Sequence, residues 1–189
     1  MRIIAGSAGG IPLRCPSGEA VRPTTDRVRQ SLFSILGDRV QGATVLDLFA
    51  GTGALGIECL SRGAAHVSFV ESHRATARLI GENIQRAKLT GEQILNQPVE
   101  TFFRSQSRGV TRVFDLILAD PPYATREGDT DYIALLLQNP VLPTLLSSEG
   151  LLVMEVPRLQ PSPDSPAWVL QDARTYGTNQ LWFLTKSKT

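Results

Sequence analysis

The tetrapeptide Asp120-Pro121-Pro122-Tyr123 follows an apolar run and combines groups that suit chemistry on the amine of a flat base. Two consecutive prolines lack amide hydrogens and have fixed φ angles, so they hold an extended backbone whose carbonyls stay free to accept hydrogen bonds. Asp120 adds a second acceptor, and stacking of a base on Tyr123 is worth about 1 to 3 kcal/mol. Two acceptors on one exocyclic amine would aim its lone pair at a methyl donor. The alternative is a polyproline segment that only ends a strand or docks a partner.

A glycine turn forms the second chemical motif, with Gly51, Gly53 and Gly56 following the apolar run 45–50. Glycines between a strand and a helix allow close approach of a ligand, and the helix N-terminus offers free amides. This spacing also occurs in NAD sites and is weak evidence alone. Asp47 distinguishes between the two kinds of cofactor. A buried carboxylate needs a partner, and a cofactor with a cationic amino-acid part supplies one. The motif therefore favours S-adenosylmethionine over NAD, and no Tyr-x-x-x-Lys pair supports a reductase.

A further acidic residue, Glu71, ends the next apolar run, 24 residues after Asp47. A carboxylate at the end of a second strand can accept both ribose hydroxyls of a nucleoside. A solvated glutamate favoured by a helix dipole is the alternative. Its distance from the glycine turn favours the ribose role.

Alternating β-branched runs and helical patterns predict the elements that position these motifs. The predicted strands are 44–49, 66–70, 93–96, 113–119, 151–156 and a final hairpin of 168–172 and 180–185. The predicted helices are 24–36, 54–62, 73–89 and a region 130–147 that Pro140 and Pro143 must break; residues 2–15 predict a hairpin or extended arm. In such a doubly wound sheet, the strand before Asp120 lies beside the strand before Gly51.

Length and composition limit the possible classes. With 189 residues, 42% hydrophobic and 20% charged, we expect a single domain, in which 1–40 is an N-terminal appendage and 41–189 the catalytic core. No apolar run approaches the roughly 20 residues that span a bilayer, and no secretion signal is present, so we expect a cytoplasmic protein without membrane contact. Neither Cys15 nor Cys59 has metal-ligand spacing, so we expect no metal site.

Charge is unevenly distributed along the chain. Residues 1–40 carry six arginines and three acidic residues, a net charge of +3, whereas the remainder carries −2. This asymmetry favours an N-terminal segment that faces phosphates. A merely solvated basic face is the alternative.

In combination, four segments resemble the RsmD-type enzymes of bacteria: 2–6 (RIIAG), 22–29 (RPTTDRVR), 46–56 (LDLFAGTGALG) and 120–123 (DPPY). Enzymes of this family methylate N2 of guanosine 966 in 16S ribosomal RNA. The resemblance covers nearly the whole chain. It implies an α/β, Rossmann-like class I S-adenosylmethionine-dependent methyltransferase fold, whose seven-stranded, mostly parallel sheet has an antiparallel last strand. It also implies S-adenosyl-L-methionine as the sole cofactor.

The resemblance assigns roles to individual residues. The catalytic segment would be Asp120, Pro121, Pro122 and Tyr123. The cofactor-binding residues would be Asp47, Ala50, Gly51, Thr52, Gly53, Glu71, Ser72, Pro98 and Val99. The RNA-binding residues would be Arg22, Thr24, Arg27 and Arg29, unless this segment is only a helix cap followed by a solvated turn. The implied partner is 16S rRNA in an assembling or assembled small subunit, bound by a monomer.

Two departures from the family pattern bear on these roles. Pro98 stands where the family usually has an acidic or amide residue that meets the adenine, so adenine recognition would fall to backbone groups or a neighbour. Residues 7–11 (SAGGI) lack the basic residues of the family's arm.

Two alternative functions remain open. The first is an adenine-N6 methyltransferase acting on DNA or RNA, since these enzymes also contain Asp-Pro-Pro-Tyr; a DNA enzyme is disfavoured because this short chain has no separate target-recognition domain. The second is a catalytically silent RNA-binding or assembly module, against which the intact Asp120 and glycine turn speak.

Overall fold

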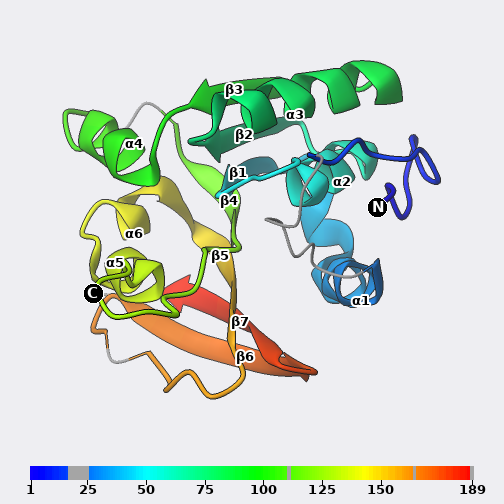
Figure 1. Cartoon of the computed structure of the whole chain (residues 1–189). Coiled ribbons are helices and arrows are strands. Elements are labelled where there is room, and N and C mark those ends of the chain that lie inside the picture. Colours follow the sequence, from blue (N-terminus) through cyan, green and yellow to red (C-terminus); the bar gives the residue numbers. More distant parts are fainter. Residues whose placement is uncertain (17–25, 110–111, 164, 188–189) are drawn as a thin grey trace.

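A seven-stranded sheet with the order β3-β2-β1-β4-β5-β7-β6 forms the centre of the computed structural model, which describes residues 1–16, 26–109, 112–163 and 165–187 (Figure 1). Its strands are β1 (Thr44–Leu48), β2 (His66–Glu71), β3 (Glu92–Asn96), β4 (Phe114–Ala119), β5 (Leu146–Pro157), β6 (Trp168–Tyr176) and β7 (Asn179–Lys186). The pairs among β1 to β5 are parallel, and β7 runs antiparallel to both β5 and β6. The predicted fold class, including the antiparallel last strand, is confirmed.

Helices cover both faces of this sheet, as Figure 1 shows. They are α1 (Asp26–Leu36), the 3-10 helix η1 (Gly37–Val40), α2 (Ala54–Ser61), α3 (Arg74–Ala87), α4 (Val99–Gln106), α5 (Tyr132–Gln138) and α6 (Leu142–Leu145). One buried cluster joins α1, α2 and α3 to one face through residues such as Phe33, Ile57 and Ile80. A second joins α4, α5 and α6 to the other face, around Phe102 and Trp182. Successive side chains of each strand point to opposite faces of the sheet, so the apolar strands contribute to a core on each face.

Three predictions about elements need correction. The helix α4 was not predicted, because its eight residues present only a short apolar stripe at Val99, Phe102 and Phe103. The predicted break in 130–147 is confirmed at Pro140, which lies between α5 and α6, but Pro143 lies in the first turn of α6, where a missing amide hydrogen costs nothing. Strand β5 begins at Leu146, five residues before the predicted start, through a stretch without β-branched residues where its register with β4 shifts.

The N-terminal residues form the predicted arm as a hairpin that lies against α2. An isolated bridge joins Arg2 to Pro12, and the amide of Ile3 donates to the carbonyl of Ile11 at 3.0 Å. Ile3, Ala8 and Leu13 are buried in the core cluster. The arm is therefore part of the folded core and not a separate unit; the predicted helix start at Thr24 lies outside the described residues.

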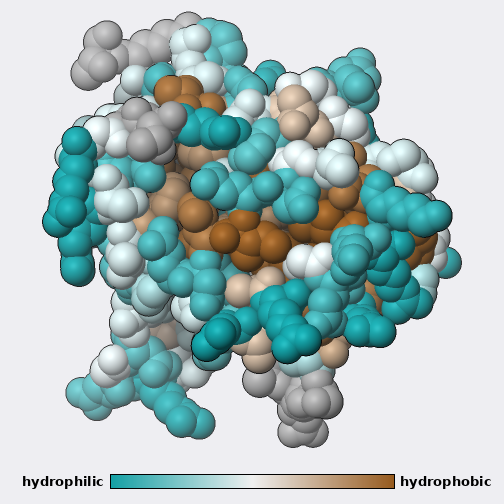
Figure 2. All heavy atoms as spheres, turned by 90° about the horizontal axis from the view of Figure 1, so that it is seen from above, coloured by the Kyte–Doolittle hydropathy of each residue, from teal (hydrophilic) through white to brown (hydrophobic). Residues whose placement is uncertain are grey.

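Strand β3 is one edge of the sheet, and the side of the molecule formed by α3 and β3 presents apolar side chains among hydrophilic ones (Figure 2). Within β3, Ile94 and Leu95 are half-buried, whereas Glu92, Gln93 and Asn96 are exposed. Polar side chains along an edge strand discourage pairing with another chain. Among the described helices, none has the length and apolar character needed to cross a membrane.

Candidate active site

A cavity of about 1360 Å³ opens beyond the carboxyl ends of β1, β2, β4 and β5. This is the edge at which open α/β sheets bind ligands. Pockets for a single drug-sized molecule measure roughly 300 to 1,000 Å³, so this cavity has room for a cofactor and part of a second molecule. Of the residues predicted from the sequence, the following line it: Arg27, Arg29, Asp47, Ala50, Gly51, Thr52, Glu71, Ser72, Pro98, Val99, Asp120, Pro121, Pro122 and Tyr123.

The glycine turn connects β1 to α2 through backbone conformations that other residues rarely adopt. Gly51 has φ of 54° and Gly53 has φ of 78°. Gly51 lies on the cavity wall, but Gly53 does not; a Cβ on Gly53 would stand 3.1 Å from the side chains of both Ile57 and Ile80. The positive φ and the close packing explain why glycine is needed at position 53, and its contact with the cofactor stays a prediction.

The carboxylate of Asp47 accepts a hydrogen bond from the amide of Gly56 at 2.9 Å. The pKa of Asp47 is raised to about 7, chiefly by burial and to a smaller extent by the negative charges of Asp120 and Glu71, and the hydrogen bond from Gly56 only partly offsets these effects. Three carboxyl groups therefore act on one another at this edge of the sheet. Such an arrangement disfavours an anion near Asp47 and favours a cation there.

Glu71 is buried at the end of β2, and backbone amides hold both of its oxygens. Oε2 accepts from the amide of Gly51 at 2.8 Å, and Oε1 accepts from the amide of His73 at 2.7 Å. The interpretation of Glu71 as a solvated strand-end residue is wrong, since only 7% of the residue is exposed. A carboxylate oxygen has two acceptor sites, so each oxygen keeps a position for a hydroxyl donor from the cavity.

Phe49, directly before the turn, is a cavity-lining residue that the sequence did not reveal. Its φ of 58° lies in a region that costs a non-glycine residue of order 1 to 3 kcal/mol, and such strain gathers at functional sites. Its ring meets the ring of Tyr132 edge-on, with centroids 5.0 Å apart. Burial raises the pKa of Tyr132, and the neighbouring Glu100 carboxylate, which accepts a hydrogen bond from the phenol, raises it further. These side chains form an aromatic wall beside α4.

Asp120 directly follows β4, and the strand register places it beside a second carboxylate. Leu118 pairs with Val153 and Ala119 with Met154, so Asp120 and Glu155 stand at corresponding positions, each one residue beyond the last pair of the two parallel strands. Residues paired in this way direct their side chains to the same face of a sheet, and both residues line the cavity. Asn179, the first residue of β7, donates to Oε1 of Glu155. The signal that was overlooked is an acidic residue inside an apolar run, as at Asp47.

The start of α4 borders the cavity where the family's adenine contact was expected. Pro98 is the N-cap residue of this helix, and Val99 follows as its first residue. Both line the cavity, and so do their neighbours Gln97 and Glu100. Because Pro98 carries no polar side-chain atom, the amide side chain of Gln97 and the first backbone amides of α4 are the available polar groups there.

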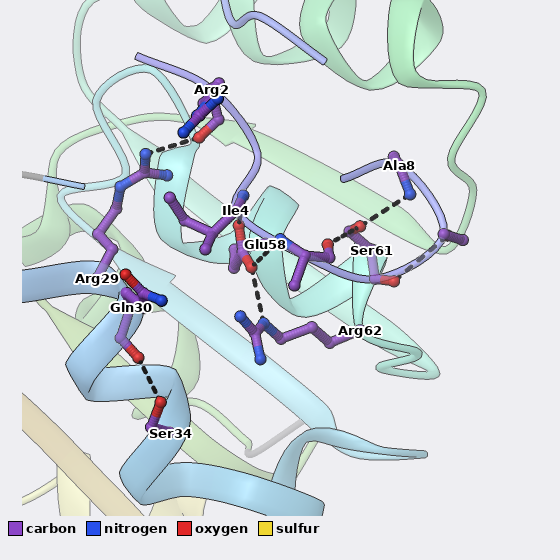
Figure 3. A network of polar contacts seen from close by, with 11 residues as sticks. Arg2, Ile4, Ala8, Arg29, Gln30, Ser34, Glu58, Ser61 and Arg62 are labelled. Atoms are coloured by element: carbon purple, nitrogen blue, oxygen red, sulfur yellow. Dashed lines mark hydrogen bonds and ion pairs between the residues drawn. The ribbon is translucent and has the colours of Figure 1, made fainter. Parts of the chain in front are cut away.

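The predicted RNA-binding arginines occupy different positions in the structure. Arg22 and Thr24 lie outside the described residues, and Arg27 is exposed at the cavity wall. Arg29 is instead buried, and its Nη2 donates to the carbonyl of Arg2 at 2.6 Å and to Asp26 at 2.8 Å (Figure 3). The expectation that Arg29 faces solvent to bind RNA is therefore not met.

The residues that the structure describes contain no group of three or more His, Cys, Asp or Glu side chains placed to hold a metal ion. Cys15 is exposed and Cys59 is buried, and neither forms a disulfide. The groups that line the cavity include carboxylates, aromatic rings, arginines and the amide and hydroxyl side chains of residues such as Gln97 and Ser72.

Comparison with known proteins gives a consistent result. Residues 1–185 match the family model described as Conserved hypothetical protein 95. The chain is 33% identical over 178 residues to Ribosomal RNA small subunit methyltransferase D of Escherichia coli K12, covering 94% of this chain and 85% of that protein. It is 33% identical over 179 residues to the protein of the same name from Haemophilus influenzae, covering 94% and 89%. A solved structure of a hypothetical protein from Thermus thermophilus superposes with a TM-score of 0.81 at 31% identity, covering 98% and 99% of the two chains.

Proposed function

Since this chain belongs to the RsmD-type family, to which the curated Ribosomal RNA small subunit methyltransferase D proteins also belong, we propose that it methylates small-subunit ribosomal RNA with S-adenosylmethionine as methyl donor. We further propose that the acceptor is the exocyclic N2 amine of a guanosine in 16S rRNA. The single observation that carries the choice of acceptor is the presence of two carboxylates at the cavity wall, Asp120 directly after β4 and Glu155 in the adjacent strand β5.

The cofactor fits the part of the cavity nearest the glycine turn. Gly51 permits close backbone approach, Glu71 keeps acceptor positions for ribose hydroxyls, and the raised pKa of Asp47, to about 7, favours a cationic ligand. S-adenosylmethionine carries an ammonium and a sulfonium, and it supplies an electrophilic methyl group when bound. Its adenine would bind between the aromatic wall, formed by Phe49 and Tyr132, and the polar groups at the start of α4.

The target amine would be held by the segment after β4. An aromatic amine is a weak nucleophile, because its lone pair is delocalised into the ring. Asp120 and a backbone carbonyl of the Pro121-Pro122 pair would accept its two hydrogens and direct the lone pair at the methyl carbon, while Tyr123 would stack against the base. The new N–C bond forms as the C–S bond breaks. The amine then carries an extra proton, which it loses to water, so the reaction requires no general base.

Glu155 favours guanine over adenine as the base. Guanine presents N1–H beside its N2 amine, so two donors point the same way, whereas adenine presents an unprotonated N1 beside its N6 amine. Two neighbouring carboxylates can accept from N1–H and from the amine of guanine together. With adenine, the second carboxylate would face the lone pair of N1. Two acceptors would then meet, and neither would have a hydrogen-bond donor. This argument favours the guanine-N2 reaction over the adenine-N6 alternative.

The surface that would hold RNA lies at the cavity mouth. Arg27 on α1 is exposed there, and the positively charged first segment adds attraction for phosphates. We propose that the protein acts as a single domain and as a monomer in the cytoplasm. Its substrate would be an assembling or assembled small subunit.

The decisive experiment is to incubate the protein and labelled S-adenosylmethionine with small subunits from a strain that lacks the corresponding enzyme, and to map the modified nucleotide. We expect N2-methylguanosine at one position of 16S rRNA. Label at an adenine, or at a guanosine atom other than N2, would contradict the proposed acceptor.

Two variants test the two carboxylates within this assay. We expect Asp120→Ala to abolish turnover while the affinity for S-adenosylhomocysteine stays within about twofold, because Asp120 acts on the amine. We expect Glu155→Gln to lower kcat/KM by roughly 10- to 100-fold, the usual effect of removing a charged hydrogen bond. Glu149→Gln, an exposed position on β5, is the matched control. Full activity in the Glu155 variant would remove the argument for guanine.

A further inference from the structure

Arg29 is a buried cation on the wall of the cavity. Only 1% of its side chain is exposed. Its Nη2 is occupied by the carbonyl of Arg2 and by Asp26, but Nε and Nη1 are buried and have no hydrogen-bond partner among the described residues. Its carboxylate partner, Asp26, is half-exposed and also lies 3.7 Å from Nε of Arg2.

Two donors of the buried Arg29 guanidinium lack, among the described residues, the hydrogen bonds that would offset their removal from water. A buried guanidinium needs hydrogen bonds for its donors, because each donor left unpaired away from water costs free energy. Arg29 is one of the residues that line the cavity, so an anion bound there is the candidate partner for the donors that the described part of the protein leaves unused. Arginine suits this role because its side chain stays charged and its planar donors match a carboxylate.

The surroundings of Arg29 indicate which anion this is. Arg29 bonds to the carbonyl of Arg2, the neighbour of Met1, and Met1 lines the cavity and contacts Thr52 of the glycine turn through a hydroxyl–sulfur contact of 3.8 Å. Arg29 is thus tied to the same turn that approaches the cofactor. Among the described residues, neither Asp47 nor Glu71 is a hydrogen-bond or ion-pair partner of Arg29.

We propose that Arg29 binds the α-carboxylate of the methionine part of the cofactor, with Nε and Nη1 as donors. This inference rests on the proposed use of S-adenosylmethionine. It gives Arg29 a role in cofactor binding in place of the expected role in RNA binding. It also gives a purpose to the contact between the N-terminal arm and α1, since the carbonyl of Arg2 fixes the positive charge of Arg29 at the cavity wall (Figure 3).

The test compares two ligands that differ at the carboxylate. S-adenosylhomocysteine carries the carboxylate, whereas 5′-methylthioadenosine keeps the adenosine and the sulfur but lacks the whole amino-acid part. Calorimetry with the Arg29→Met variant should show roughly 10- to 100-fold weaker binding of S-adenosylhomocysteine and less than twofold weaker binding of 5′-methylthioadenosine. Arg29→Lys should recover part of the loss. Retained binding of 5′-methylthioadenosine would also demonstrate that the variant is folded.

Arg27→Met is the matched control, since it removes a positive charge from the same helix at the same cavity. It should leave the affinity for S-adenosylhomocysteine within about twofold and weaken binding of 16S rRNA. Equal losses for both ligands in Arg29→Met, or no loss for either, would overturn the inference while leaving the proposed function intact. Failure of the unaltered protein to bind S-adenosylhomocysteine would instead overturn the proposed function.

Discussion

Oδ2 of Asp47 lies 2.9 Å from the amide nitrogen of Gly56, so a carboxylate inside β1 holds the first turn of α2. Burial raises the pKa of this carboxyl from 3.8 to about 7. Between these values the folded chain binds a proton that the unfolded chain has lost. The group therefore contributes stability that is fully present below about pH 4 and is lost as pH rises through about 7.

We expect the melting temperature of the cofactor-free protein to fall, relative to that of Asp47→Asn, as pH rises from 4 to 7, because the asparagine carries no proton to lose. Thermal unfolding of both proteins across this range checks the prediction. We also expect affinity for S-adenosylmethionine to increase through pH 7 in the unaltered protein, as Asp47 becomes anionic, and to lose this dependence in the variant. Parallel pH profiles would contradict both statements.

The buried Glu71 should contribute to cofactor affinity through ribose hydroxyls. Glu71→Gln retains one oxygen acceptor but loses the negative charge, so S-adenosylhomocysteine should bind roughly tenfold more weakly or worse, in line with the loss of charge-assisted hydrogen bonds. Glu92→Gln changes an exposed glutamate on the adjacent strand and should leave affinity unaltered. Equal dissociation constants for the two variants would rule out the ribose role.

Two helical glycines should respond to alanine in opposite directions. A Cβ on Gly56 would stand 2.3 Å from the ring of Phe69, so Gly56→Ala should destabilise the fold by about 1 to 3 kcal/mol through overpacking. A Cβ on Gly81 would make an ordinary 3.6 Å contact with Ile94, so Gly81→Ala should stabilise α3 by about 0.5 to 1 kcal/mol. Urea unfolding of both variants is the measurement, and two shifts of the same sign would contradict it.

Glu58 should control how firmly the N-terminal arm docks. Its fully buried carboxylate accepts from the amides of Ile4 and Ala5 at 2.6 and 3.0 Å and from Nε of Arg62 at 2.7 Å (Figure 3). Glu58→Gln replaces an acceptor oxygen by a donor, so one of these amides loses its partner at a cost of about 1 to 3 kcal/mol.

Hydrogen exchange at the amides of Ile4 and Ala5 reports this loosening directly. We expect exchange there to accelerate by at least tenfold in Glu58→Gln and to remain unchanged in the surface variant Glu149→Gln. Acceleration spread evenly over the whole chain would instead indicate general destabilisation.

The sequence was sufficient to predict site residues that lie in or directly after the strands bordering the cavity. Asp47, Glu71 and Asp120 each end or interrupt an apolar run, and parallel strands bring such ends to one edge of the sheet. The cavity does contain all three. The predicted membership in the RsmD-type family, carried by the same motifs, is confirmed.

Residues whose position depends on distant segments could not be predicted in this way. Glu155 joins the site only because the register between β4 and β5 sets it beside Asp120. Arg29 is buried only because the arm folds back and offers the carbonyl of Arg2, so its charge alone suggested an exposed contact with RNA. Neither relationship leaves a periodic signal in the local sequence.

The position of β7 between β5 and β6 has a consequence for biogenesis. The ribosome makes β6 before β7, yet among the described strands β6 pairs with β7 alone, and β7 also covers the open edge of β5. A nascent chain that has not yet released residues 179–186 therefore exposes an unpaired apolar strand edge, the kind of surface on which incomplete chains aggregate. A premature stop only a dozen residues from the end should thus yield insoluble protein and not a shortened, working domain.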